Sequence, residues 1–323
     1  MQSTMTDEHM EDQSAATSVE TTSSVKGFVV LSRLPFLSPG IAALVTGIFM
    51  GVGDGYDPEA GLAWMSVGGL ALIMLATYYF NEYYDFEGDV INKTFIMFSG
   101  GSRAIADRMV PRTIARIAGL VSVAILAAIA IVYLLFYFED YPYLLPMALF
   151  GAICGIFYSH PPFQWSYKGV GEILIGGCYG ILAVTSGYYV ASGVVEPKTI
   201  LLGVPASLSI FGVIVANEFP DYEADRAVNK LNLVVRMGLG GASKMYMVAM
   251  ALVYPFMVAS VLVGVSSYIV VFGLPVLVLC GVAIAETGKD GYSRRESQVK
   301  ISGVTLLANL LSSLLFIPVM LIW

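Results

Sequence analysis

The sequence predicts an all-α polytopic membrane protein, a bundle of nine transmembrane helices, and three observations support this fold class. First, 57% of the 323 residues are hydrophobic and only 13% are charged, whereas soluble domains carry about a quarter charged residues. Second, the mean hydropathy is +0.76. Third, the apolar residues gather into runs of about 20, the length that a helix needs to cross a bilayer. These observations exclude an ordinary soluble domain, a disordered chain and a disulfide scaffold.

Taken in order along the chain, the elements divide into a tail and one membrane domain. Residues 1–26 are polar and rich in Ser, Thr, Asp and Glu, which predicts a disordered acidic tail on the cytoplasmic side. Residues 27–323 form the predicted transmembrane domain. Its nine expected spans are 34–52, 61–80, 113–137, 141–158, 170–191, 198–216, 244–264, 267–286 and 302–322.

The distribution of basic residues predicts the orientation of these spans. With nine spans, 16 of the 17 Lys and Arg residues fall on the side of the N-terminus, and only Lys198 falls on the other. Because basic residues are enriched in cytoplasmic loops, we expect the N-terminus to be cytoplasmic. A multi-pass protein of the cell membrane follows from this pattern.

Charge and cysteine content exclude further classes of site. The formal net charge is −7 and no basic stripe runs along the chain, so a nucleic-acid partner is not expected. The three cysteines lie inside apolar runs without a CxxC spacing, which favours small buried side chains over zinc ligands or disulfides. Two histidines are too few for a histidine-based metal site. The oligomeric state is open.

A nine-residue motif occurs twice and indicates an internal repeat. Residues 81–89 and 217–225 both read N-E-aromatic-x-D-aromatic-E-x-D, and they lie 136 positions apart. Each copy follows an even-numbered span, so both are expected on the cytoplasmic side. A duplication of a helix bundle with its repeats in parallel orientation explains this arrangement.

The spacing within each motif indicates a cation site. Residues four apart share one face of a helix, so Asn81, Asp85 and Asp89 form one polar stripe. The second copy forms the other, with Asn217, Asp221 and Asp225. Like charges one turn apart repel, and a bound cation would offset that cost. Oxygen-only ligands favour Mg²⁺. The simpler alternative for one motif is a solvated acidic helix end, but two matched copies favour the metal.

Basic residues beside the motifs indicate that the cation site also binds a diphosphate. They are Lys93 and Arg103 after the first copy, and Arg226 and Lys230 after the second. Magnesium and cationic side chains together neutralise diphosphate oxygens. At the mouth of an apolar bundle, a lipid diphosphate is the fitting substrate, with its tail between helices. Loss of diphosphate from an allylic carbon leaves a cation that aromatic faces stabilise, and Tyr158 is the candidate for that role.

The two motifs resemble those of the UbiA superfamily of intramembrane prenyltransferases. The family signature contains N-D-x-x-D-x-x-x-D and D-x-x-x-D segments on cytoplasmic loops of a nine-helix bundle, and the resemblance covers about residues 30–322. Further strings, at residues 99–103, 158–172 and 217–238, look most like the branch that prenylates 1,4-dihydroxy-2-naphthoate in menaquinone synthesis. Glu82 departs from the usual Asp of the first motif, and Asn229 replaces an expected Gly.

The resemblance implies roles for individual residues. It implies Mg²⁺ held by Asp85, Asp89, Asp221 and Asp225, with Asn81 and Asn217 assisting the metal and the diphosphate. Lys93, Arg103, Arg226 and Lys230 would bind the diphosphate, and Tyr158 and Lys168 would lie on the wall of the catalytic cavity.

These features together predict a magnesium-dependent enzyme. It would transfer a polyprenyl group from polyprenyl diphosphate to a small aromatic acceptor, 1,4-dihydroxy-2-naphthoate being favoured. Other acceptors stay open, namely 4-hydroxybenzoate, a chlorophyllide-type ring or an archaeal glycerol phosphate lipid. A cation-coupled transporter is a more remote alternative, because transporter sites lie nearer the bilayer midplane. A lipid-binding scaffold would not need two metal-spaced motifs.

Overall fold

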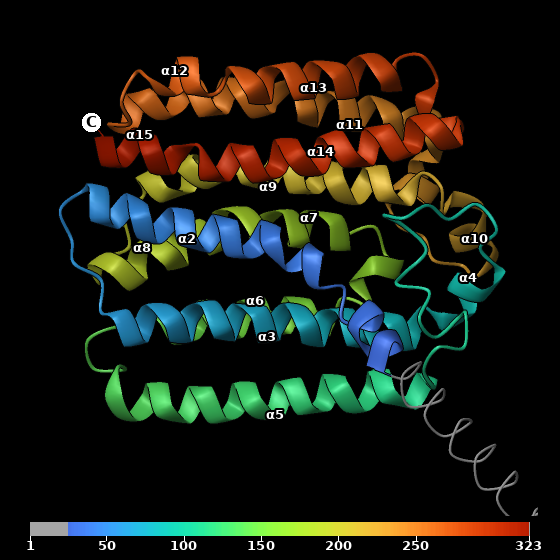
Figure 1. The fold of residues 1–323 in the computed structure, drawn as a ribbon, viewed down its shortest axis with the longest axis horizontal. Coiled ribbons are helices and arrows are strands. Elements are labelled where there is room, and N and C mark those ends of the chain that lie inside the picture. The colour runs from blue at the N-terminus through green and yellow to red at the C-terminus, as the bar shows by residue number, and fades with distance from the viewer. Residues whose placement is uncertain (1–24, 323) are drawn as a thin grey trace, which may run out of the picture.

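The fold is a bundle of helices that run roughly parallel or antiparallel to one another (Figure 1). It is described here from a computed structural model, which describes residues 25–322; over that range the chain contains helices and loops and no β-strand. The predicted tail therefore lies outside the described residues, apart from Val25 and Lys26, which open the first helical segment.

Among the described residues, 25–322, eight helical segments are long and apolar enough to cross a membrane, and they support a multi-pass membrane protein. They are Val25–Gly53, Ala60–Tyr84, Arg112–Phe136, Gly171–Ser192, Lys198–Glu218, Leu233–Val263, Ile269–Thr287 and Arg295–Ile322. A ninth apolar helix, Leu144–Ile156, corresponds to the predicted span 141–158 but has 13 residues. At 1.5 Å per residue it is about 20 Å long, short of the roughly 30 Å hydrocarbon layer. The predicted count of nine spanning helices is therefore not confirmed.

Several of these segments consist of more than one element. The first half contains η1 (Leu34–Leu37), α2 (Ser38–Gly53), α3 (Ala60–Tyr84), α4 (Phe86–Ile91), α5 (Arg112–Phe136), α6 (Leu144–Ile156), η2 (Trp165–Tyr167), α7 (Gly171–Gly177), η3 (Cys178–Leu182) and α8 (Ala183–Ser192). The second half contains α9 (Lys198–Glu218), α10 (Tyr222–Ala227), α11 (Leu233–Ala259), η4 (Ser260–Val263), α12 (Ile269–Phe272), α13 (Leu274–Thr287), η5 (Gly291–Ser293), α14 (Arg295–Leu314) and α15 (Phe316–Ile322).

Small residues allow the central helices to pack closely. A Cβ atom on Gly187 of α8 would lie 2.0 Å from the carbonyl oxygen of Leu44, and one on Gly47 of α2 would lie 2.1 Å from that of Val184. Backbones approach this closely in membrane bundles where small residues line the interface. By contrast, α5 lies at the edge of the bundle (Figure 1), and its Leu135 and Phe136 are each 71% exposed. Such an apolar outer surface fits a lipid environment.

The two short helices that carry the motifs lie at the same end of the bundle. Figure 1 shows α4 and α10 beside each other at the right, and the two helices contact one another. Their bounds, Phe86–Ile91 and Tyr222–Ala227, differ by the same 136 positions as the motifs. The two short helices therefore occupy equivalent positions in the two copies of the motif, and their contact brings the duplicated carboxylates to the same end of the bundle.

Candidate active site

The first motif forms a bend between two nearly continuous helices. Asp85 ends α3 and begins α4, with φ −84° and ψ 0°. The amide of Asp85 donates to the carbonyl of Asn81 (2.8 Å), and that of Asp89 donates to the carbonyl of Asp85 (3.0 Å). The helical spacing expected for Asn81, Asp85 and Asp89 is thus present in the backbone hydrogen bonds.

The second motif leaves the regular helix over a longer stretch than the first, and it contains a proline. Pro220 has no amide hydrogen, and the amide of Asp221 donates to Glu218 (3.2 Å) rather than to Asn217. Helix α9 ends at Glu218, and Asp221 then begins α10. The polar stripe predicted for Asn217, Asp221 and Asp225 is therefore interrupted after its first member. Asp225 keeps its helical bond to Asp221, at 2.8 Å.

A polar cavity of about 170 Å³ lies between the two motifs. Its lining includes residues of both copies together with two cationic and several aromatic side chains. The motif residues are Asn81, Asp85, Asp89, Asn217, Asp221 and Asp225; the others include Arg33, Tyr78, Tyr158, Tyr179, Glu218 and Lys230. The metal-ligand candidates that the sequence suggested from two segments 136 positions apart thus line one cavity.

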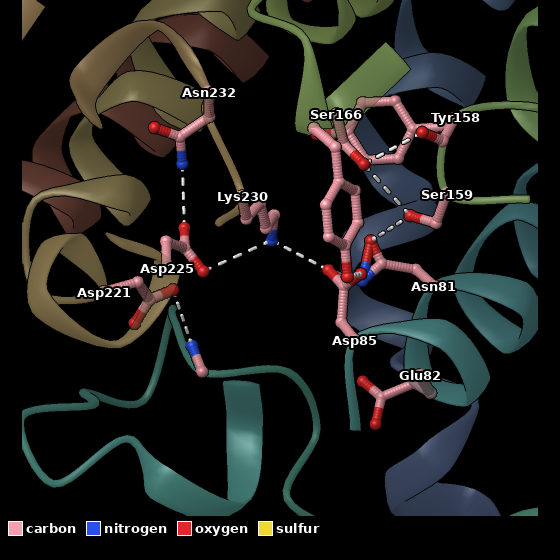
Figure 2. A network of polar contacts seen from close by, with 12 residues as sticks. Asn81, Glu82, Asp85, Tyr158, Ser159, Ser166, Asp221, Asp225, Lys230 and Asn232 are labelled. Carbon is pink, nitrogen blue, oxygen red and sulfur yellow. Dashed lines mark hydrogen bonds and ion pairs between the residues drawn. The ribbon is translucent and has the colours of Figure 1, made fainter. Parts of the chain in front are cut away.

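Lys230 connects the two motifs directly. Its ammonium lies 2.7 Å from Asp85 Oδ2 and 3.5 Å from Asp225 Oδ1, and Figure 2 shows it between these carboxylates. Asp85 also accepts hydrogen bonds from Asn81 Nδ2 (3.0 Å) and from the Tyr167 hydroxyl (2.9 Å). Asp225 accepts a further bond from Asn232 Nδ2 (2.8 Å). Both carboxylates are therefore oriented from several directions.

The loop between α4 and α5 contacts three further acids of the motifs, Glu82, Asp89 and Asp221. Asp221 accepts hydrogen bonds from Asn92 Nδ2 (2.7 Å) and from the amide of Gly100 (2.9 Å). Glu82 accepts bonds from the amide and the hydroxyl of Ser102. Gly101 in this loop has φ +67°, and a Cβ atom there would lie 2.4 Å from Asp89 Oδ2. The loop can approach the carboxylates this closely because glycine has no side chain.

Four basic residues predicted for the site, Arg103, Lys93, Arg226 and Lys168, are not among the residues that line the cavity. Arg103 donates to the carbonyl oxygen of Asp89 and lies 4.2 Å from the ring centre of Phe95. Lys93, Arg226 and Lys168 are exposed. Of the four cations suggested for diphosphate binding, the structure brings Lys230 into the cavity. Tyr158 lines the cavity as expected, and its pKa is raised by burial and by nearby carboxylates.

Several residues of the site were missed by sequence reasoning. Tyr167 and Asn232 bind the motif carboxylates, and Asn92 binds Asp221. Arg33, on the first helical segment, lies 3.7 Å from Glu82 and 4.7 Å from the ring centre of Phe36. A signal existed for Asn232, because an Asn directly before a helix is a common N-cap and its side chain accepts from the amide of Val235. The others carried no local signal.

Burial and mutual repulsion shape the charges of the acids. Burial raises the pKa of Asp89, and Glu82 and Asp85 raise it further. Burial also raises the pKa of Asp225 to about 7, against the opposing effect of Lys230. For Lys230 itself, burial disfavours the charge, but Asp225 and Asp85 outweigh it and raise its pKa. The motif carboxylates therefore carry more potential negative charge than the single ammonium of Lys230 neutralises.

The donor set of the cavity fits a hard divalent cation. Asn217 Oδ1 is buried and has no hydrogen-bond partner, which is costly unless a ligand contacts it. The motif side chains supply carboxylate and amide oxygens, the ligands that Mg²⁺ prefers. Within residues 25–322, no three acidic, thiol or imidazole side chains are close enough to form a preassembled metal site. The motif carboxylates instead accept hydrogen bonds from Lys230, from asparagine side chains and from a backbone amide.

An apolar cavity of similar volume adjoins the polar one. It lies among α3, α5, α6 and η3, and its lining includes Leu70, Ile129, Ala148 and Leu182. Thr77, Ile175 and Tyr179 line both cavities. A molecule with a polar head and a long apolar tail could therefore extend from the carboxylates into the bundle.

A multi-pass helical bundle with this duplicated carboxylate cavity at one end defines a class of membrane protein, and sequence comparison gives the family. The sequence pattern of the UbiA prenyltransferase family matches residues 40–319. The chain belongs to the UbiA prenyltransferase family.

Individual relatives are similar at modest identity. The 1,4-dihydroxy-2-naphthoate octaprenyltransferase of Bacillus subtilis is 26% identical over 196 residues, which cover 60% of this chain and 61% of the relative. The apo structure of a UbiA homologue from Aeropyrum pernix K1 superimposes with a TM-score of 0.63 at 17% identity, over 83% of this chain and 94% of that one. A UbiA homologue from Archaeoglobus fulgidus bound to GPP and Mg²⁺ gives a TM-score of 0.54 at 16% identity, over 89% and 99%. These structures share the fold.

Proposed function

We propose that this protein transfers a polyprenyl group from polyprenyl diphosphate to a small aromatic acceptor, most favourably 1,4-dihydroxy-2-naphthoate, with Mg²⁺. The observation that carries the proposal is the single cavity lined by both copies of the motif and continued by an apolar cavity. The head group would meet the carboxylates, and the polyprenyl tail would lie among α3, α5, α6 and η3. The names of the B. subtilis relative and of the ligands in the A. fulgidus structure support the same reaction class.

The residues of the cavity have separate roles in this proposal. Asp85, Asp89, Asp221 and Asp225, with Asn81 and Asn217, would hold Mg²⁺, which neutralises charge on the departing diphosphate when bound. Lys230 would bind diphosphate oxygens, while Arg103 fixes the backbone of Asp89. Lys93 and Arg226, exposed beside the motifs, would attract the anion. Lys168, which is exposed, would act at the edge of the catalytic cavity.

The aromatic side chains of the cavity would protect the reactive carbon. Tyr158, Tyr78 and Tyr179 line the polar cavity, and Tyr179 also lines the apolar one. Aromatic faces stabilise a developing allylic cation, and their bulk limits access of water to it. An electron-rich ring carbon of the acceptor would then form the new bond. With the naphthoate acceptor, the ring would also lose its carboxylate.

We propose that this cavity lies on the cytoplasmic side of the cell membrane, because nearly all basic residues are expected on that side. Residues 1–26 would form a cytoplasmic tail ahead of the prenyltransferase domain at 27–323. This side gives a water-soluble acceptor direct access, while the prenyl chain enters from the bilayer.

The proposal is tested with purified protein, Mg²⁺, a mixture of prenyl diphosphates and a panel of aromatic acceptors, using mass spectrometry of the lipid product. Asp85→Asn and Asp221→Asn should lower turnover at least 100-fold, because each removes a charge from the cavity. Glu223→Gln is the matched control, since this acid of the second motif is exposed and should retain turnover. Absence of prenylated product with every acceptor, together with absence of diphosphate release, would overturn the proposal.

A further inference from the structure

We propose that Lys230 occupies the position of a bound cation between the two motifs and gives it up when a diphosphate arrives, so that divalent metal binding depends on diphosphate. This inference rests on the proposed function, because it assumes that the cavity receives a diphosphate. It makes Lys230 a diphosphate-binding residue whose place in the resting protein sets the order of binding.

The position of the ammonium carries the inference. Lys230 Nζ lies 2.7 Å from Asp85 Oδ2 and 3.5 Å from Asp225 Oδ1, in the line between the two motifs (Figure 2). A magnesium ion would bind carboxylate oxygens at about 2.0–2.1 Å. Asp85 Oδ2 already accepts from Asn81 Nδ2 as well as from Lys230, so both lone pairs of this oxygen are in use. A metal that took Asp85 Oδ2 and Asp225 Oδ1 as ligands would therefore compete with Lys230 for them, and the like charge of the ammonium would oppose it.

The other partners of these carboxylates are neutral and can remain. Asp85 keeps Asn81 and Tyr167, and Asp225 keeps Asn232. These donors hold the carboxylates in place after the ammonium leaves. Lys230 is the exchangeable partner because its charge is carried on a flexible four-carbon stem.

The backbone beside Lys230 stays attached while the side chain moves. The amide of Lys230 donates to the carbonyl of Asp225 (2.9 Å), and Asn229 has a left-handed φ of +56°. The lysine is therefore anchored at the edge of the cavity in either position of its ammonium. Its Nζ also lies 5.9 Å from the ring centre of Tyr167.

Charge explains why the metal alone should bind poorly. The lysine side chain is 16% exposed, so an ammonium that loses both carboxylates would be left partly buried and unpaired, which is costly. A diphosphate supplies new oxygens for the displaced ammonium and further ligands for the metal. Metal and diphosphate together therefore exchange one complete set of ion pairs for another, whereas the metal alone does not.

The test measures Mn²⁺ binding by equilibrium dialysis, with and without inorganic pyrophosphate on both sides of the membrane. In the wild-type protein, pyrophosphate should tighten Mn²⁺ binding at least tenfold. Lys230→Met should bind Mn²⁺ without pyrophosphate at least tenfold more tightly than wild type, and pyrophosphate should add less. Arg236→Gln is the matched control, because it removes an exposed cation six residues away that bonds Leu231 O; it should behave as wild type.

The result that overturns the inference is Mn²⁺ binding by Lys230→Met that is no tighter than that of wild type without pyrophosphate. If Lys230→Met does not fold, Lys230→Gln replaces it, and a lack of tighter binding there overturns the inference in the same way. Lys230→Arg keeps the charge and should preserve the dependence on pyrophosphate. The measurement needs no turnover. If Lys230→Met binds Mn²⁺ more tightly than wild type but the wild-type protein transfers no prenyl group, the proposed function alone is contradicted. If the enzyme is active but Lys230→Met binds Mn²⁺ no more tightly, this inference alone is contradicted.

Discussion

Asp225 is a motif carboxylate that takes part in the ion pairs of the cavity. It accepts Asn232 on one oxygen and pairs with Lys230 on the other. Burial nevertheless raises its pKa to about 7, because it outweighs the stabilising charge of Lys230. At the scale of single residues, the site thus contains a carboxylate that is only partly ionised near neutral pH when no metal is bound.

The raised pKa of Asp225 predicts a pH dependence of stability. The folded protein binds more protons than the unfolded chain between the ordinary pKa near 3.8 and the raised value near 7. The free energy of unfolding should therefore fall as pH rises through this window, by up to about 1.4 kcal/mol per pH unit from this group, and level off above pH 7. Thermal melts in detergent with EDTA at pH 5 to 8 measure it.

Asp225→Asn is the control for this pH prediction. The amide does not titrate, so the stability of the variant relative to wild type should increase as pH rises from 5 to 7. A constant difference over the whole range would show that Asp225 does not take up a proton in the folded protein.

At the scale of elements, the close pairing of α2 and α8 depends on glycine. The Cβ position of Gly187 is 2.0 Å from a backbone oxygen of α2, an atom that cannot move without moving the helix. These two helices form part of the frame between the cavity end and the opposite end of the bundle. Close approach here requires small residues rather than apolar residues in general.

Gly187→Ala should therefore destabilise the bundle although alanine favours helices. We expect a loss of about 1–3 kcal/mol, the usual cost of an overpacked interior, measured by reversible unfolding in mixed detergent or as a lower melting temperature. Gly68→Ala is the matched helical control, because no atom lies within 4 Å of its Cβ position. Equal stability of the two variants would contradict the close packing of α2 against α8.

Another element depends on one backbone conformation. Helix α11 contains Gly238 with φ +69° and ψ 158°, a conformation outside the helical region, so the segment begins with a short turn before its long apolar part. The sequence predicted a span at 244–264, whereas α11 begins at Leu233. Glu172, on α7, accepts the amide of Leu233 at 2.6 Å and fixes that beginning.

At the scale of the whole molecule, the arrangement separates a charged end from an apolar body. Both motifs, α4 and α10 gather at one end, while the loop with Asp57 joins α2 to α3 at the other end (Figure 1). The distribution of basic residues supports our proposal that the charged end faces the cytoplasm.

Labelling of introduced cysteines tests this orientation. Glu223→Cys lies at the motif end and Asp57→Cys at the opposite end, and both positions are exposed. In intact cells a membrane-impermeant maleimide should label Asp57→Cys and leave Glu223→Cys unlabelled until the membrane is permeabilised. The cysteine-free parent, made by replacing Cys154, Cys178 and Cys280, gives the background. The reverse pattern would place the cavity on the outer side.

Much of the fold was predictable because hydropathy and spacing are local properties of the chain. The spans expected at 61–80, 113–137, 170–191 and 198–216 each fall within a helical segment of the structure to within about one residue. The expected span at 141–158 is shorter in the structure because regular helix extends only from Leu144 to Ile156. The segment 170–191 also contains a π-helical turn at Cys178–Leu182, where Gly180 packs against Ser207, and no sequence period indicates such contacts.

The sequence by itself determined that this is a helical membrane protein and that its candidate site offers carboxylate and amide oxygens as ligands. Both properties are local, because the length of an apolar run and a motif repeated after 136 residues can be recognised without knowing which segments pack together. Tertiary structure decided which cation and which neutral donors meet the carboxylates. Lys230 reaches Asp85 across 145 positions, and Tyr167 reaches it across 82. Such convergence depends on how helices pack, which is why Lys230 is in the cavity while Lys93, Arg226 and Lys168, just as basic in the sequence, are exposed.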